Sequence, residues 1–206
     1  MLRVDTARAQ RLPRDQRRAQ LLAAATRAFS DRGYHAVAMD DVAEGAGVSK
    51  PVLYQHFASK LELYLALLDS ACQELVDMVA GALASTTRNS DRVAAAMAAF
   101  FGFVAARGSS FRFVFESDLR TEPEVALRIR AVHQELAAQI GAVIAADTGL
   151  EQPEAELLGF SLIGMAETGA RYWLDEPAGV ARERAVELAS TLAWRGVRGF
   201  PRASAE

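Results

Sequence analysis

Apolar side chains recur along almost the whole chain at intervals of three and four residues, which is the spacing of one face of an α-helix. Turn residues separate these periodic segments. The pattern predicts helices over 14–32, 39–45, 49–57, 59–84 and about 92–106, then a brief aromatic segment at 111–119, and helices from 121, over 153–174 and over 179–197. We therefore expect an all-α fold with about nine helices.

Residues 39–57 have the spacing that two helices need to cross tightly. Ala43 is small where the helices approach, and Gly47 suits the left-handed backbone of a turn. Val48 and Leu53 are apolar where the second helix must be buried. Three apolar residues of the preceding helix can complete a three-helix core: Leu22, Ala25 and Phe29. We expect a helix-turn-helix domain over 14–58, a flexible basic arm over 1–13 before it, and a larger helical ligand-binding and dimerisation domain over 59–206.

Several helix boundaries carry their own signals. Gly33 is the expected C-terminal stop of the first helix. Ser49 can cap the helix over 49–57, in which Pro51 is tolerated because a first-turn N–H has no helical partner. Two segments have the form of a capping box, in which a hydroxyl accepts from the third helical amide and a glutamate reaches back to the first: Ser59-Lys60-Leu61-Glu62 and Thr121-Glu122-Pro123-Glu124.

Charge is distributed unevenly along the chain. The formal net charge is −3, yet residues 1–60 carry ten Lys and Arg against six Asp and Glu, a net charge of +4, while residues 61–206 have a net charge of −7. A basic head (residues 1–60) on an acidic body (residues 61–206) indicates an anionic partner for the head alone. The two lysines, Lys50 and Lys60, both lie in the head, whereas the whole chain has 21 arginines.

The single cysteine, Cys72, excludes an intramolecular disulfide and indicates a reducing compartment. No apolar run approaches the ~20 residues of a membrane span, and the arginine-rich N-terminus lacks the apolar core of a secretory signal. We therefore expect a cytoplasmic protein without a membrane partner.

The helix over 49–57 leaves a polar face outside when its apolar residues turn inward. Lys50 at the positive helix end suits a phosphate or a guanine edge, Gln55 can read an adenine edge, and Val52 can touch a thymine methyl. The residues predicted to contact a double-stranded DNA operator are Ser49, Lys50, Pro51, Val52, Tyr54, Gln55, His56 and Lys60. Of these, Tyr54, His56 and Lys60 are placed to hold phosphates. The alternative is an ordinary polar helix face. Because one helix-turn-helix contacts only a few base pairs, we expect a homodimer that places two such helices about 34–36 Å apart.

The segment FSDRGYHAVAMDDVAEGAGVSKPVLYQHFASKLELYLALL (29–68) resembles the DNA-binding region of TetR-family transcriptional regulators. The resemblance implies that the outward residues of 50–56 lie in or beside the major groove and that Lys60 holds a phosphate. It also implies that the last two helices form a four-helix bundle across the dimer axis. One departure concerns Val37 and Ala38, which stand where the family usually has Thr or Ser to cap the second helix and touch the DNA backbone. The basic arm can supply a replacement contact.

The chain contains no arrangement of catalytic side chains. His35, His56 and His133 are far apart in sequence, and none pairs with Cys72 or with an acid at metal-ligand spacing. We expect no enzymatic activity, no metal and no cofactor.

Apolar residues of the body can form either a packed core or a cavity. Six phenylalanines fall within sixteen residues: Phe100, Phe101, Phe103, Phe111, Phe113 and Phe115. The helix over 153–174 has two stripes, one with Leu158, Leu162, Met165, Gly169 and Tyr172, and one with Leu157, Ser161, Gly164 and Thr168. Because this helix is apolar nearly all round, we expect one face to close a pocket and the smaller face to pack against a second subunit.

Three segments resemble the actinobacterial FasR-type regulators of fatty-acid synthesis: RLPRDQRRAQLL (11–22), FRFVFESDLRTEPEVA (111–126) and LIGMAETGARYWLDEP (162–177). The resemblance implies a small hydrophobic effector, a long-chain acyl-coenzyme A, with its acyl chain in a tunnel through the body. The residues expected to line the tunnel are Phe100, Phe101, Val104, Phe111, Phe115, Leu119, Leu136, Ile140, Leu162, Met165, Tyr172 and Trp173. The candidates for its phosphates are Arg107, Arg112, Arg120 and Arg171, whereas His133 is better explained as a satisfied core histidine.

Two other functions are compatible with the same pattern. A repressor of an efflux or catabolic gene would share the helix-turn-helix and the dimer but bind a compact aromatic or cationic compound. It would need a buried acid, such as Glu116 or Glu167 turned inward. A body that only dimerises would show a filled core without a cavity. Activation or repression depends on where the operator lies relative to the promoter.

Overall fold

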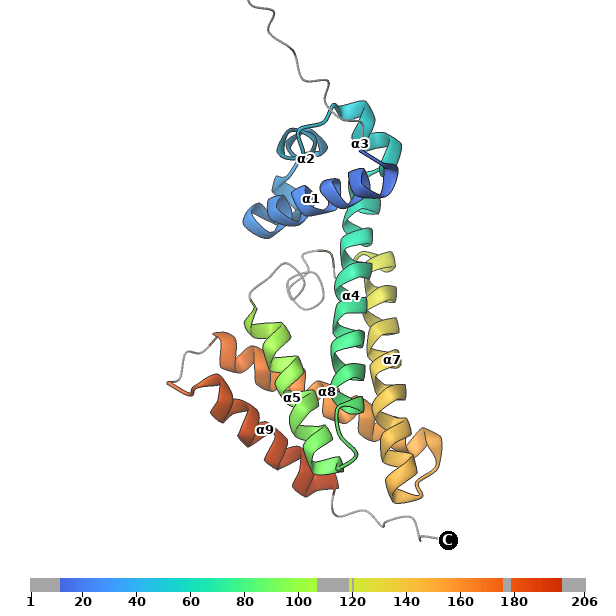
Figure 1. The fold of residues 1–206 in the computed structure, drawn as a ribbon, viewed down its shortest axis with the longest axis vertical. Coiled ribbons are helices and arrows are strands. Elements are labelled where there is room, and N and C mark those ends of the chain that lie inside the picture. Colours follow the sequence, from blue (N-terminus) through green and yellow to red (C-terminus); the bar gives the residue numbers. More distant parts are fainter. Residues whose placement is uncertain (1–11, 107–118, 120, 176–178, 198–206) are drawn as a thin grey trace, which may run out of the picture. The chain divides into compact units, whose positions relative to one another are not determined.

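The computed structural model of this chain describes residues 12–106, 119, 121–175 and 179–197. All the regular secondary structure within these ranges is α-helical, which confirms the predicted fold class. The eight helices that they contain are α1 (Arg14–Ala36), α2 (Met39–Gly45), α3 (Lys50–His56), α4 (Lys60–Ala84), α5 (Asn89–Ala105), α7 (Pro123–Thr148), α8 (Gln152–Asp175) and α9 (Arg182–Val197) (Figure 1). The aromatic segment expected near 111–119 lies outside the described residues, apart from Leu119.

The chain divides into two compact units, Met1–Ala66 and Leu67–Glu206. The helix α4 begins in the N-terminal unit and ends in the C-terminal unit. The functional boundaries expected at residues 13 and 58 stay predictions. None of the helices in the described ranges is long and apolar enough to cross a membrane.

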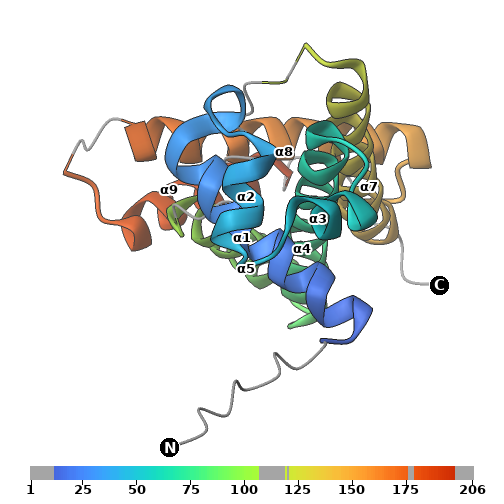
Figure 2. The ribbon, with the colours of Figure 1, turned by 90° about the horizontal axis from the view of Figure 1, so that it is seen from above.

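The N-terminal unit is the predicted three-helix arrangement. Figures 1 and 2 show α2 packed on α1, with α3 following after a short turn. The core-facing stripe of α1 runs through Leu21, Ala25 and Phe29, all fully or nearly fully buried. Leu22, which we expected in this core, is only half-buried. The stripe has a spacing of four residues, and the residue after Leu21 points about 100° away from it around the helix.

Two glycines supply the left-handed backbone that the N-terminal unit requires. Gly47 has a φ of 64° in the turn between α2 and α3, as its position predicts. Gly33 has a φ of 76° and a ψ of 164°, so it breaks the helical geometry near the end of α1 where the stop was expected. Both positions would strain any residue with a Cβ.

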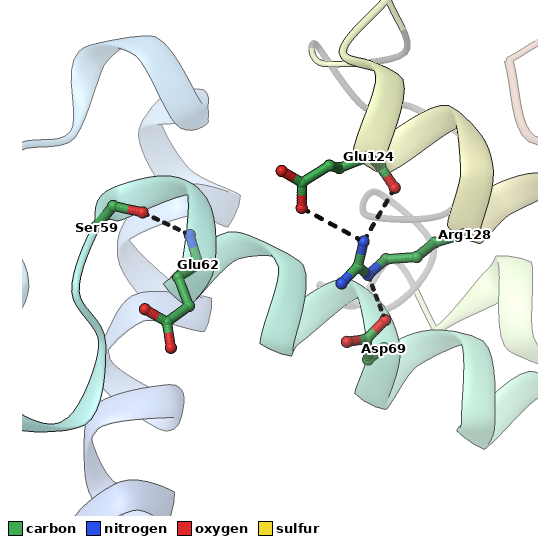
Figure 3. A network of polar contacts seen from close by, with 5 residues as sticks. All are labelled: Ser59, Glu62, Asp69, Glu124 and Arg128. Atoms are coloured by element: carbon green, nitrogen blue, oxygen red, sulfur yellow. Dashed lines mark hydrogen bonds and ion pairs between the residues drawn. The ribbon is translucent and has the colours of Figure 1, made fainter.

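The helix starts follow the predicted caps only in part. Ser59 Oγ accepts a hydrogen bond from the Glu62 amide at 3.0 Å (Figure 3), while the Glu62 carboxylate accepts from the Ala58 amide and not from the first helical amide. The cap predicted at Thr121 is wrong: α7 begins at Pro123 with Glu122 before it, because proline is already set for the first helical position. Ser49 has the backbone of a cap residue at α3, but its side chain makes no capping hydrogen bond.

In the C-terminal unit, α7 and α8 form an antiparallel pair in close backbone contact. The buried stripe of α8 consists of Ala155, Gly159, Ile163, Ala166 and Ala170. None of these residues belongs to either of the two stripes expected for this helix. The buried stripe consists mostly of small residues, which allow two helices to approach most closely. A Cβ added at Gly159 would lie 2.6 Å from the carbonyl oxygen of Ala137, and one added at Gly141 would lie 3.0 Å from the backbone nitrogen of Glu156.

An ion pair joins α7 to α4 within the C-terminal unit. The Arg128 guanidinium donates through Nε to Asp69 Oδ1 at 2.8 Å and through a terminal nitrogen to the Glu124 carbonyl at 3.1 Å (Figure 3). Figure 1 shows α7 running beside α4 over this region. Because the pair is largely exposed, it defines the alignment of the two helices more than it stabilises them.

Replacing Gly159 by alanine should lower the free energy of unfolding by about 1–3 kcal/mol, because the new methyl group overlaps the Ala137 carbonyl and the two helices must separate. Gly81→Ala on α4 is the matched control: nothing lies within 4 Å of a Cβ added there, so the better helix propensity should stabilise by up to about 1 kcal/mol. Urea unfolding followed by circular dichroism measures both. Equal effects of the two substitutions would contradict the close α7–α8 contact.

Candidate nucleic-acid interface and effector cavity

The outward face of α3 carries the side chains predicted to contact DNA. Leu53 and the following Phe57 are fully buried, which fixes the rotation of the helix. Five of the predicted residues are exposed: Ser49, Lys50, Pro51, Tyr54 and Gln55. Val52 and His56 are half-buried beside them, and Val48, expected in the core, is also half-buried. The helix therefore presents a continuous polar surface with one aromatic ring.

Lys50 is paired with an acid of the preceding helix. Its Nζ lies 2.9 Å from Oδ1 and 3.1 Å from Oδ2 of Asp40, in the first turn of α2. The hydrogen bond and the charge of Asp40 raise the pKa of Lys50. Asp40 was not identified from the sequence, because the ten residues between the two side chains include the turn that brings them together.

Lys60 has a structural function in addition to its predicted phosphate contact. Its Nζ donates to the carbonyl oxygens of Tyr34 at 2.9 Å and Val37 at 2.8 Å, and lies 4.2 Å from the centre of the Tyr34 ring. These carbonyls belong to the end of α1, and that of Tyr34 also accepts from the Val37 amide at 3.4 Å. An ammonium has three N–H donors, so two of them hold the end of α1 against the start of α4.

The departure at Val37 and Ala38 is compensated inside the N-terminal unit. The Ala38 amide donates to Asp41 Oδ2 at 2.9 Å, and the same carboxylate lies 3.2 Å from Arg32. Asp41 thus supplies one half of a capping box at the start of α2, and Val37 is almost fully buried in the core. This bond compensates for only part of the missing cap, because Ala38 offers no side-chain acceptor to the first-turn amides of α2.

Three arginines at the start of α1 extend the positive surface next to α3. Burial lowers the pKa of His56, and Arg14, Arg18 and Arg17 lower it further in that order, so the imidazole is neutral at neutral pH. The Arg18 guanidinium also lies 4.4 Å from the centre of the Phe57 ring. These arginines were not assigned to the DNA surface from the sequence. The sequence does contain a feature that could have indicated them, three arginines within five residues at a helix start.

The C-terminal unit contains a narrow apolar cavity between four helices. It has a volume of about 60 Å³ and includes four of the predicted tunnel residues, Phe100, Leu136, Ile140 and Leu162. Its other lining residues are Val79, Leu83, Val93, Ala96, Met97, Ile163 and Ala166. A second space of about 50 Å³ shares Leu83, Val93, Ile140 and Leu162 with the first and extends to polar residues at Asn89, Arg92 and Thr148. The two spaces are neighbours, because they share these four lining residues.

A separate apolar groove, with a volume of about 320 Å³, lies between α5, α8 and α9. Four other predicted tunnel residues line it, Phe101, Met165, Tyr172 and Trp173. The Trp173 indole packs on Phe101, with 5.8 Å between the ring centres, and donates to the Val180 carbonyl at 2.9 Å. Val104 and Leu119 are buried and line neither space, while Phe111 and Phe115 lie outside the described residues. The structure thus divides the predicted set between two sites.

A polar cluster lies between α7 and α8 of the C-terminal unit. The Glu167 carboxylate is 2.7 Å from the Arg171 guanidinium and 3.4 Å from His133 Nε2. The Glu167 side chain is only 19% exposed, so this acid does turn inward, but it is already held by a cation. The other arginines expected to bind phosphates, at 107, 112 and 120, lie outside the described residues, as does Glu116.

The described residues show no catalytic group. Burial raises the pKa of Cys72 to about 12, and the nearby Asp69 raises it as well, so the thiol is not a nucleophile at neutral pH. No three His, Cys, Asp or Glu side chains lie close enough to hold a metal ion within the described ranges.

Replacing Lys60 by methionine should lower the free energy of unfolding by about 2 kcal/mol, because two backbone carbonyls lose a charged donor. The other lysine of the chain is the matched control, since Lys50→Met breaks only an exposed ion pair and should leave stability nearly unchanged. Urea titrations of both variants provide the measurement. If the two variants unfold at the same urea concentration, Lys60 does not hold the end of α1.

Comparison with protein families accounts for both units. The family described as bacterial regulatory proteins, tetR family, matches residues 21–67. A family described as tetracyclin repressor-like, C-terminal domain, matches residues 89–196. The two matches cover the helix-turn-helix and the cavity-bearing unit in turn.

Individual relatives agree with this assignment. The HTH-type transcriptional activator FasR of Mycolicibacterium smegmatis is 45% identical over 194 residues, which are 94% of this chain and 89% of the relative. The HTH-type transcriptional regulator TtgR of Pseudomonas putida is 51% identical, but over only 53 residues, 26% of this chain and 25% of that protein. The crystal structure of a TetR-like transcriptional regulator from Rhodococcus sp. RHA1 superposes with a TM-score of 0.71 at 28% identity, covering 92% of this chain and all of that one. The chain belongs to the TetR family of DNA-binding transcription regulators, and it is not an enzyme.

Proposed function

We propose that this regulator controls genes of lipid metabolism and that a long-chain acyl-coenzyme A, bound in the C-terminal unit, sets its affinity for operator DNA in the cytoplasm. The observation that carries the proposal is the extent of the likeness to FasR, which continues through the unit that contains the cavity. The likeness to TtgR stops after the N-terminal region. The segments that resemble FasR-type regulators of fatty-acid synthesis point to an acyl effector, and the cavity between α4, α5, α7 and α8 is apolar.

The size of the cavity gives the effector a way to act. At about 60 Å³ it is far smaller than the ~300–1,000 Å³ of ordinary ligand pockets, so an acyl chain can enter only if the surrounding helices separate. Each methylene buried there contributes about 0.8 kcal/mol. The ligand therefore binds the open arrangement far better than the closed one, and this difference in affinity is what shifts the equilibrium.

The helix α4 connects this opening to the N-terminal unit. Val79 and Leu83 of α4 line the cavity, while Lys60 at its other end binds the carbonyls of α1. A displacement of α4 would change the separation of the two α3 helices in a dimer, and with it the fit to two half-sites.

At the DNA, we assign α3 to the major groove. Lys50, Val52 and Gln55 would contact base edges, with Ser49 and Pro51 beside them. Tyr54 and His56 would hold phosphates, the latter through a neutral N–H. The arginines at the start of α1 would add further phosphate contacts, and Lys60 would act mainly by positioning α1.

The dimer would form through α8 and α9. Their outer faces expose large apolar side chains, among them Leu157 and Phe160 on α8 and Leu188 and Leu192 on α9. Gly164 lies among these on α8, exposed and with open space around it. Exposed apolar residues on two neighbouring helices mark an interaction surface, and a two-fold partner would present the same surface in return.

A repressor that responds to a cationic compound is the second candidate, and the inward-turned Glu167 favours it. The Arg171 guanidinium 2.7 Å from that carboxylate weakens the case, because a cationic ligand would have to compete with it.

The effector can be tested by native mass spectrometry of the protein with added palmitoyl-coenzyme A. We expect one acyl ligand per subunit. Ala96→Phe fills the cavity and should lower the ligand affinity by at least about tenfold, whereas Ala98→Phe, on the exposed side of the same helix, should not. A protein that ignores the acyl ligand but binds a cationic aromatic compound would replace the lipid proposal with the second candidate.

The dimer surface can be tested with one residue. Gly164→Arg places a charged side chain on the exposed face of α8 and should convert the dimer to monomers at micromolar concentration. Gly81→Arg puts the same side chain in open space on α4 and should leave the dimer intact. Sedimentation velocity distinguishes the two states. A Gly164→Arg variant that remains dimeric would exclude this face.

A further inference from the structure

The surface predicted to contact DNA contains an acidic side chain, Asp40, next to the recognition helix α3. Asp40 is in the first turn of α2, and its carboxylate contacts the Lys50 ammonium through both oxygens, at 2.9 and 3.1 Å. The two side chains are 63% and 56% exposed, so both face solvent on the side predicted to meet the phosphate backbone. A negative charge there repels phosphates and lowers the affinity for all DNA.

The fold explains this acid only in part, because the helix dipole favours an acid in the first turn of α2. An exposed ion pair contributes little to stability, and the cap of α2 is supplied by the next residue, Asp41, which accepts from the Ala38 amide. Glu44, at the other end of the same helix, is also exposed but forms no ion pair with a described residue. Among the acids of α2, Asp40 alone is paired with a residue of the recognition helix.

We propose that Asp40 is a specificity-determining residue, which holds Lys50 in a neutral pair so that this lysine binds a base edge of the operator but not the phosphates of arbitrary DNA. The inference rests on the proposed recognition surface. A phosphate can bind Lys50 only by displacing Asp40 or by approaching its negative charge. The guanine acceptors O6 and N7 carry no net charge, so one of them can take the remaining N–H donor of the ammonium while Asp40 keeps its own contact. The pair therefore penalises non-specific binding more than specific binding.

The test compares two DNA probes by fluorescence anisotropy: a duplex that the wild-type protein selects from a random pool, and a scrambled duplex of the same length and composition. Asp40→Asn should bind the scrambled duplex about fivefold to tenfold more tightly and the selected duplex no more than about twofold more tightly. Between about 50 and 200 mM salt, its affinity for the scrambled duplex should fall more steeply, by about one unit of log–log slope per subunit. Asp40→Ala must reproduce the loss of discrimination, which excludes an effect peculiar to asparagine.

Glu44→Gln is the matched control, because it makes the same change of charge on the same helix without touching Lys50. It should change both affinities by less than about twofold. If it matches Asp40→Asn, the effect is diffuse charge and the inference is overturned. The Lys50→Met background gives a second check: Asp40→Asn should have no effect there if it acts through Lys50, and an undiminished gain overturns the inference.

The same variants separate this inference from the proposed function. Lys50→Met should weaken binding to the selected duplex and relax discrimination at one position of each half-site. If it leaves that binding unchanged, the recognition surface itself is wrong. If it weakens binding while Asp40→Asn behaves like the wild type on both probes, only the function given to Asp40 is wrong.

Discussion

The continuity of α4 is the constraint on which the proposed switch depends. The helix runs from Lys60 to Ala84, so it begins in the N-terminal unit and ends in the C-terminal unit. Its first residue holds the carbonyls of Tyr34 and Val37, and its last turns line the apolar cavity. In the proposed switch, an effector in the cavity would influence α3 through two positions of this helix that it binds with different affinity.

The contact between α7 and α8 limits which helices can move. At Gly159 and Gly141 the two backbones meet without side chains between them, so separating this pair would lose contacts that nothing can replace. The walls from α4 and α5 include longer side chains, Met97 and Phe100 of α5 and Leu83 of α4. We therefore expect that α4 and α5 move when the cavity opens for a ligand. The pairing of Asp69 with Arg128, being exposed, can break and re-form at small cost as α4 shifts along α7.

Local features of the fold were predictable from the sequence, whereas features set by packing were not. Gly47 and Gly33 adopt the left-handed backbone that their positions indicated, because this depends on the chain nearby. Whether Leu21 or Leu22 is buried depends on the rotation of α1 about its axis relative to α2 and α3. The spacing of apolar residues in the sequence is compatible with either residue. The pairing of Asp40 with Lys50 and the division of the tunnel residues between two spaces also arise from tertiary contacts. The polar face of α3 was identified correctly, since the buried Leu53 and Phe57 fix its direction.

At both lysine positions of this arginine-rich chain, a lysine suits the surrounding contacts better than an arginine would. At Lys60 the two carbonyl acceptors and the Tyr34 ring converge on one point, which suits a compact ammonium and not a planar guanidinium fork. At Lys50 an arginine would engage both oxygens of Asp40 with two parallel hydrogen bonds, and the pair would be tighter and less free to share with a base. The tetrahedral donors of an ammonium can instead be divided between a carboxylate and a base edge. The same chemistry therefore makes one lysine a structural link and, on the proposed recognition surface, would let the other exchange its partner for a base.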